Sequence, residues 1–171
     1  IPSSVEVNKK YKIKDNFITL YLKENKERSI EFKYEPKLKD RDNGNYVLTY
    51  GPLLFSLPID YRSETKEYVR NNVERKYPYC DYYFIPTSEY KYAFNSNEFK
   101  VIENEFVRPF DRENPPLLIE SEFIKVDIRN KKGYEYVLSN KISKVLNKTK
   151  VIKMKPYGAT YLRMTEMFKI D

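Results

Sequence analysis

The sequence lacks several residue types on which common protein chemistries depend. It has no histidine, no tryptophan and a single cysteine among 171 residues. The absence of histidine removes the usual general base and the commonest zinc ligand, and one cysteine excludes an internal disulfide. No stretch approaches the roughly 20 consecutive apolar residues of a membrane helix. We therefore expect no metal, no other cofactor and no membrane partner.

The excess of positive charge is modest. Lys and Arg number 32 and Asp and Glu 25, for a net charge of +7, which taken alone would suggest an anionic partner such as nucleic acid. The two signs alternate along the chain, however, as in residues 23–29 and 62–67. Such mixing is typical of a solvated surface, so we expect no nucleic-acid partner.

Aromatic residues and period-2 alternation are abundant. The chain has 17 Tyr and 10 Phe, which favour strands. Half-buried strands are predicted in five alternating segments: 11–14, 17–22, 29–34, 123–128 and 150–155. Turn signals at Asp15-Asn16 and Asn43-Gly44 lie between such segments.

This pattern predicts one all-β domain over residues 1–171. About a dozen short strands with turns between them indicate a jelly-roll-like β-sandwich of two mostly antiparallel sheets. At most one short helix is expected, at residues 63–76, and this segment could equally be a long polar loop. Residues 139–148 are ambiguous in the same way.

A Gly-Pro pair interrupts the most apolar run, residues 45–61. Proline does not fit inside a central strand. We interpret Gly51-Pro52 as a bulge or a crossing between sheets, with a strand at 53–57 that is buried on both faces. The alternative is a simple loop between two short strands.

Eight aromatic residues crowd into residues 77–94. Flat rings with hydroxyl groups suit sugar rings, and they also suit packing against another domain. We expect carbohydrate or domain contact from five tyrosines, the last of which lies in a tight turn: Tyr79, Tyr82, Tyr90, Tyr92 and Tyr157. The alternative is that many of these rings belong to the core.

No catalytic residue is expected in this chain. Cys80 has no histidine to activate it, so a buried cysteine is the simpler interpretation. Glu120 and Glu122 would share one face of a strand, about 7 Å apart, a spacing that glycoside hydrolysis can use. Any Glu-x-Glu on a strand has this spacing, so a solvated face is the alternative. Whether the chain is part of an enzyme stays open.

Several segments, in order, resemble glycoside hydrolase family 127, the β-L-arabinofuranosidase-type proteins. Residues 50–57 (YGPLLFSL) resemble its RGPLVYALE stretch, and residues 83–94 its P-x-S-x-W-N-Y-A-L segment, with Tyr90 in place of Trp. Pro115-Pro116-Leu117 gives a third similarity. Residues 154–166 (MKPYGATYLRMTE) resemble the LIPYGAT-x-LRITEF stretch near the family's C-terminus.

The resemblance covers nearly the whole chain and implies the family's C-terminal β-sandwich. In that family a catalytic (α/α) barrel precedes this region and carries a cysteine nucleophile, a glutamate acid/base and a zinc site. None of those motifs occurs here, so no catalytic role is transferred. The resemblance implies a non-catalytic domain that supports a catalytic barrel domain, with carbohydrate as a further partner.

Two alternatives remain, a free-standing carbohydrate-binding module and a protein-interaction domain. An accessory domain should expose an apolar patch, a binding module an aromatic platform or groove, and an interaction domain an open sheet edge. The start at Ile1-Pro2 leads us to expect a piece of a larger protein. No signal peptide is visible, which favours a cytoplasmic location, and the compartment stays open.

Overall fold

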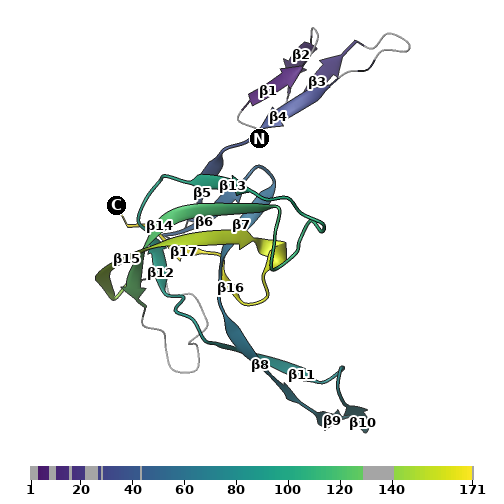
Figure 1. The fold of residues 1–171 in the computed structure, drawn as a ribbon, viewed down its shortest axis with the longest axis vertical. Helices are drawn as coiled ribbons and strands as arrows, with labels where there is room; N and C mark the ends of the chain where they lie inside the picture. Colours follow the sequence, from purple (N-terminus) through teal and green to yellow (C-terminus); the bar gives the residue numbers. More distant parts are fainter. Residues whose placement is uncertain are drawn as a thin grey trace.

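The computed structural model describes residues 4–7, 11–15, 17–21, 27, 29–42, 44–128 and 141–170. Strands dominate these residues, and the predicted all-β, sandwich-like fold is confirmed (Figure 1). A single 3-10 turn, η1 (Tyr157–Ala159), is the one helical element in the described ranges. No described helix is therefore long and apolar enough to cross a membrane.

The body of the molecule is one nine-stranded sheet. Its main path has the order β12-β14-β15-β7-β6-β17, while β13, β16 and β5 pair with β14, β7 and β6 respectively. Its strands are β5 (Pro36–Asp40), β6 (Asn45–Tyr50), β7 (Leu53–Pro58), β12 (Tyr92–Phe94), β13 (Lys100–Glu103), β14 (Leu117–Asp127), β15 (Lys144–Pro156), β16 (Arg163–Met164) and β17 (Met167–Phe168). The strand pairs along this path are antiparallel.

The sheet curls until its two end strands meet. Phe94 of β12 forms a parallel bridge with Lys169, just after β17. The Ile170 N–H donates to the Phe94 carbonyl over 2.9 Å. The two halves of one continuous sheet therefore face each other across a shared interior, as two sheets do in a sandwich.

Large apolar side chains fill this interior. Phe94 lies 5.0 Å from Phe123, centroid to centroid, and both rings are fully buried. The main cluster comprises Leu48, Phe55, Leu57, Ile59, Tyr92, Phe94, Ile119, Phe123, Met154 and Met167. Each such side chain contributes about 1.5–3 kcal/mol on burial, so the body has a core of its own.

Gly51-Pro52 is a two-residue hairpin turn, so the expected bulge or sheet crossing is wrong. Tyr50 pairs with Leu53 directly across it, and β6 and β7 are neighbours in the same sheet. Gly51 has φ +57°, as the first central residue of a tight hairpin requires. The Tyr34 ring covers this glycine so closely that a Cβ atom would lie 2.8 Å from it. The expected burial of β7 on both faces is confirmed at 55–57.

Residues 63–76 form strands, so the expectation of a helix or a long polar loop there is wrong. Asn71 and Asn72 adopt φ of 52° and 59° and turn the chain between β9 (Tyr68–Arg70) and β10 (Val73–Arg75). Asparagine tolerates this left-handed conformation better than most residues. The pair therefore acts as a hairpin turn.

Two projections leave the body at opposite ends of its long axis (Figure 1). One, which we name the arm, spans residues 60–87 between β7 and β12. It contains β9 and β10 at its far end, together with β8 (Tyr61–Lys66) and β11 (Asp81–Pro86), which pair along their full length. The other contains two N-terminal two-stranded sheets. One pairs β1 (Ser4–Val7) with β4 (Ile30–Lys33), and the other is the hairpin of β2 (Tyr11–Lys14) and β3 (Phe17–Leu20).

The predicted alternating strands lie in β2, β3, β4, β14 and β15. Of the predicted turn residues, Asn16 and Asn43 lie outside the described residues, and the flanking strands pair antiparallel, β2 with β3 and β5 with β6. In the ambiguous segment 139–148, residues from Lys144 onward belong to β15, while 139 and 140 lie outside the described residues. After η1 the chain forms two short strands, β16 and β17, which pair with β7 and β6 respectively.

We expect Gly51→Ala to destabilise the chain by about 2–4 kcal/mol, because it combines left-handed strain with a clash against Tyr34. Gly44→Ala is the matched control, since Gly44 has φ +79° but nothing within 4 Å of an added Cβ. That change should cost about 1–2 kcal/mol. Urea unfolding of both variants provides the comparison, and equal losses would contradict the close packing of Tyr34.

Candidate functional site

The structure does not bring the five predicted tyrosines together. Tyr79 and Tyr82 lie on the arm and are 79% and 44% exposed. Tyr92 is buried in the core and Tyr90 packs against that core, as the alternative interpretation held. Tyr157 is exposed in η1, where the Arg163 guanidinium lies 3.6 Å from its ring centroid. The surface-exposed members therefore occupy two separate places.

Local hydrogen bonds shape the far end of the arm. The Tyr79 N–H donates to the Lys76 carbonyl over 2.7 Å, and the Tyr77 N–H to the Glu67 carboxylate over 3.1 Å. The Tyr82 hydroxyl donates to the Pro78 carbonyl over 3.0 Å. Loss of surrounding water raises the pKa of Tyr82 above 10.0, which keeps this donor protonated. Tyr77 and Tyr79 are left on the surface as a result.

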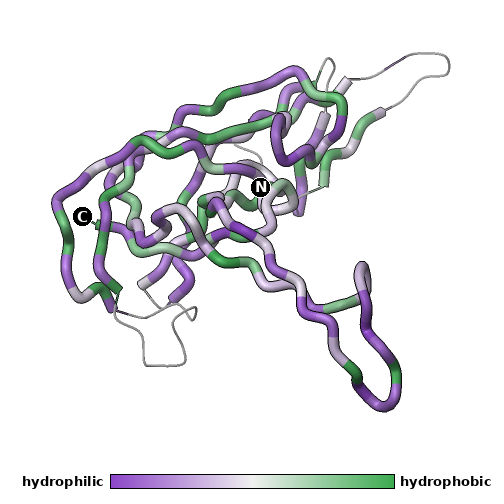
Figure 2. The backbone as a smooth tube through the Cα atoms, turned by 60° about the horizontal axis from the view of Figure 1, so that its bottom comes forward, coloured by the Kyte–Doolittle hydropathy of each residue, from purple (hydrophilic) through white to green (hydrophobic). Residues whose placement is uncertain are grey.

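Cys80 is buried at this end of the arm, as expected of a structural cysteine. Beyond its base the arm exposes six apolar or aromatic side chains. They are Val69, Val73, Tyr77, Tyr79, Tyr82 and Tyr83. Figure 2 shows short hydrophobic stretches among hydrophilic ones along the backbone of the arm. Sequence reasoning missed the two valines, because it treated their segment as a helix or polar loop. The Asn71-Asn72 turn between them was the signal that could have revealed them.

Three aromatic rings join the arm to the body. Phe84 of β11 lies 4.8 Å from Tyr61 of β8 in an edge-on contact, and it stacks on Tyr161 of the body at 5.8 Å. The Arg112 guanidinium lies 3.4 Å from the Tyr161 ring centroid and donates to its hydroxyl. Such ring contacts contribute about 0.5–1.5 kcal/mol each beyond burial, so this cluster fixes the base of the arm.

A cleft of about 230 Å³ opens beside this cluster. Its charged lining residues are Asp60, Arg112, Glu113 and Lys155. The two cationic side chains already have partners within the protein. Lys155 donates to the Arg112 carbonyl, and Arg112 donates to the Tyr161 hydroxyl. The cleft residues thus belong to the attachment of the arm.

Asp111 organises the loop that carries this rim. Its carboxylate accepts the N–H groups of Glu113 and Asn114 over 2.8 and 3.0 Å. These two backbone hydrogen bonds hold the pKa of Asp111 below 3.8. The ionised carboxylate is therefore the form that fits the folded loop.

Each N-terminal two-stranded sheet has one apolar face. Residues directly opposite in an antiparallel pair share a face, which places these pairs together: Val5 with Phe32, Val7 with Ile30, Tyr11 with Leu20 and Ile13 with Ile18. We name these eight residues the N-terminal platform. Ile13 is 58% exposed and Phe32 46%, so the described residues leave much of the platform uncovered.

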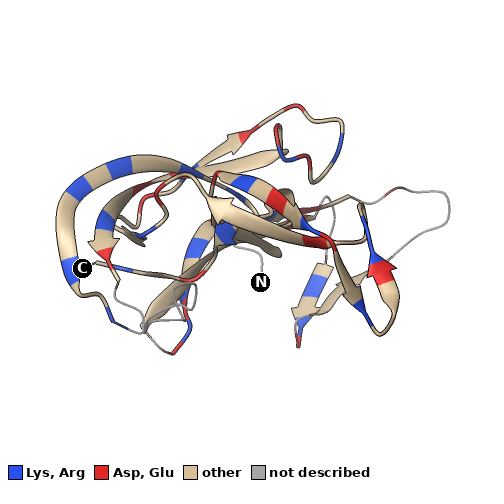
Figure 3. Cartoon of the chain, turned by 90° about the horizontal axis from the view of Figure 1, so that it is seen from below, with Lys and Arg blue, Asp and Glu red and all other residues tan. Residues whose placement is uncertain are grey.

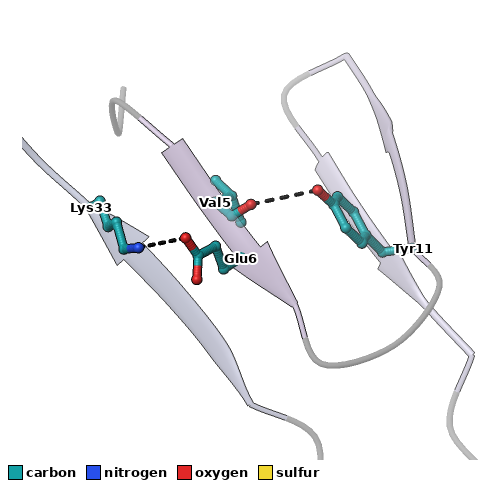
Figure 4. A network of polar contacts seen from close by, with 4 residues as sticks. All are labelled: Val5, Glu6, Tyr11 and Lys33. Carbon is teal, nitrogen blue, oxygen red and sulfur yellow. Dashed lines mark hydrogen bonds and ion pairs between the residues drawn. The ribbon is translucent and has the colours of Figure 1, made fainter.

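Polar contacts join the strands of this projection. β1 lies between β4 and β2 (Figure 4), and the hydroxyl of the platform residue Tyr11 reaches the Val5 carbonyl over 3.4 Å. On the polar face Lys33 forms an ion pair with Glu6, and the hydrogen bond between them raises the pKa of Lys33 above 10.5. The projection therefore has a polar face with an ion pair and an apolar face that the described residues cover only in part.

The carboxylates considered for catalysis have structural partners. Glu120 lies 4.0 Å from the Lys100 ammonium group, and Glu122 accepts a hydrogen bond from the Asn95 amide. Arg163 also has structural partners, since it donates to the carbonyls of Thr160 and Tyr161. Within the described ranges, no cluster of three or more Cys, Asp and Glu residues could hold a metal ion.

Comparison with protein-family models, curated proteins and solved structures finds no match. The resemblance to glycoside hydrolase family 127 therefore stays a prediction from the quoted segments. The geometry on its own describes a β-rich body with two projections that present apolar side chains.

We expect Tyr161→Ala to loosen the arm without unfolding the body. The loss of two ring contacts should cost about 1–2 kcal/mol locally, which corresponds to roughly 5- to 30-fold faster amide exchange in β8 and β11. Exchange in β14 and β15 should not change. Tyr79→Ala is the control, because this ring is exposed far from the base. Equal effects of both variants would contradict the proposed attachment.

We expect Asp111 to stabilise the chain in a pH-dependent way. Its pKa is lowered in the folded state, so its contribution is present above the ordinary pKa of about 3.9 and is lost as the pH falls through the lower folded value. Urea unfolding at a series of pH values should show the difference between wild type and Asp111→Ala shrinking toward pH 3 and below. A difference that is constant with pH would contradict this role.

Proposed function

We propose that this chain is a non-catalytic docking domain that binds the surface of a larger protein through its N-terminal platform and its arm. The uncovered apolar face of the platform carries this proposal. The resemblance to glycoside hydrolase family 127 suggests which protein is bound. In this version of the proposal, the larger protein is a glycosidase-like parent, and the bound surface belongs to its catalytic (α/α) barrel.

The energetics of the platform support docking. Covering an exposed Ile or Phe side chain contributes about 1.5–3 kcal/mol. Ile13, Phe32, Tyr11 and Ile30 are each 38–58% exposed, so a cover over this face would gain several kcal/mol. Contiguous apolar patches of this kind are uncommon on isolated soluble proteins and mark interaction sites.

The ring arrangement supports docking better than sugar binding. A carbohydrate-binding module presents aromatic faces around a groove with convergent polar groups. Here Tyr61, Phe84 and Tyr161 pack against one another, with interplanar angles near 80° for Tyr61 against the other two. The exposed rings Tyr77 and Tyr79 lie far from that cluster, at the distal end of the arm.

The platform can be tested before a partner is known. Ile13→Lys with Phe32→Lys should remove most of the fluorescence of the apolar dye anilinonaphthalene sulfonate on the native chain. Phe17→Lys is the matched control, since Phe17 is 76% exposed on the opposite face of the β2–β3 hairpin, across from Lys14. An equal loss with Phe17→Lys, or no loss with the double variant, would contradict the proposed surface.

The identity of the partner needs a separate experiment. The longest product of the reading frame should be assayed on aryl β-L-arabinofuranosides, with this chain as the control. If this longest product contains a barrel and is active, Ile13→Lys with Phe32→Lys should lower its thermal stability, and Phe17→Lys should not. If it contains no barrel, the glycosidase form of the proposal is wrong.

A further inference from the structure

The strand β15 has an open edge along most of its length. It pairs with β14 from Lys144 to Met154, but it pairs with β7 only at Lys155 and Pro156. In the part of the chain that the structure describes, no other strand pairs with residues 144–153. Backbone N–H and C=O groups that point away from β14 are therefore available for pairing.

Lysines line this edge. Lys144, Lys148, Lys150 and Lys153 are all exposed, and β15 contains no acidic residue. Figure 3 shows lysines, in blue, spaced along this long curved strand. None of the four forms an ion pair within 4.0 Å among the described residues. Lys144 and Lys153 lie directly opposite Asp127 and Glu120 of β14, whereas no carboxylate is paired in register with Lys148 or Lys150. The positive charge of this edge is therefore least compensated at Lys148 and Lys150.

Part of this edge is a regular strand, as the pairing register of β15 with β14 shows. Pairing between β14 and β15 is continuous from Thr149 to Met154, and the irregularity that ends it includes Asn147, whose φ is +49°. Six residues are a typical strand length. Lys150 and Lys153 fall within this section on opposite faces, because side chains alternate along a strand, and Val151 between them is 58% exposed.

We propose that the open edge of β15 binds an extended acidic peptide segment by strand addition. Its backbone pairs with residues 149–153, and its carboxylates, spaced at alternate residues, lie beside Lys148 and Lys150. Strand addition of this kind takes affinity from main-chain hydrogen bonds and specificity from alternate side chains. Pairing of this edge with the same edge of a second copy of the chain is disfavoured, because the lysines of the two edges would repel each other.

The observations favour a peptide over nucleic acid. A strand edge offers alternating main-chain donors and acceptors, which an extended peptide matches group by group. A phosphate backbone supplies acceptors alone and would leave the strand's carbonyl groups unpaired. This inference is independent of the docking function, since it uses neither the platform nor the arm.

The test uses the full chain and a fluorescein-labelled peptide of alternating Glu and Val residues, followed by anisotropy at low salt. Lys148→Glu with Lys150→Glu should weaken binding at least about tenfold, which equals about 1.4 kcal/mol. The matched control is Lys37→Glu with Lys39→Glu, two exposed lysines with the same spacing on β5 of the same sheet. It should change the affinity less than about twofold, by the same conversion.

The same two pairs of lysines should also be changed to alanine, because alanine removes the charge without reversing it and disturbs the fold less. The alanine pair at 148 and 150 should again weaken binding more than the alanine pair at 37 and 39. Hydrogen exchange should show protection of residues 149–153 when the peptide is bound. The proposal is overturned if a Glu-Pro peptide of equal charge binds as tightly, since proline cannot donate to the strand edge. Equally tight binding of an oligothymidylate, equal losses in both lysine pairs, or no protection at 149–153 would also overturn it.

Discussion

The contact that closes the curled sheet is the constraint on which the rest of the structure depends. The bridge between Phe94 and Lys169 and the hydrogen bond from Ile170 join the two end strands. Met167 and Phe168 enter the core directly beside this closure. Without it, β12 and β17 would expose two strand edges, and the interior around Phe94 would open to water.

A closed body lets the projections carry exposed apolar residues. The arm begins and ends at one point, where the Thr87 N–H donates to the Asp60 carbonyl over 2.7 Å. The N-terminal two-stranded sheets join the body through β5, which pairs along its whole length with β6. Neither projection contributes to the main core cluster, so their surfaces are available for contacts with other molecules.

The alternating strands could be predicted, because each depends on a local pattern. The arm could not be predicted as long as its charged segment was treated as a helix, and the Asn71-Asn72 pair shows how strongly one turn decides such a segment. Gly51-Pro52 was assigned to the wrong kind of turn, since a hairpin and a sheet crossing use the same residues. Which turn forms depends on the partner strands.

The predicted site consisted of tyrosines. Where both faces of a strand carry aromatic residues, the sequence pattern does not decide which face points into the core. Tyr92 is in the core because it follows the arm into β12, whose three residues are all buried. Tyr79 is exposed because it lies at the far end of the arm. The platform went unrecognised as a surface because its strands have the same alternation as half-buried core strands. Only the three-dimensional arrangement shows that four side chains of its apolar face, Tyr11, Ile13, Ile30 and Phe32, remain exposed among the described residues.

The most direct test of the central claim is hydrogen exchange of the isolated chain, followed strand by strand at neutral pH. The account predicts that the amides of β6, β7, β14 and β15 exchange with the stability of the whole body, while those of β1 to β4 exchange much faster at every protein concentration. Protection of β1 to β4 equal to that of the body, in a monomeric sample, would contradict the claim that the platform lacks a cover until a partner binds.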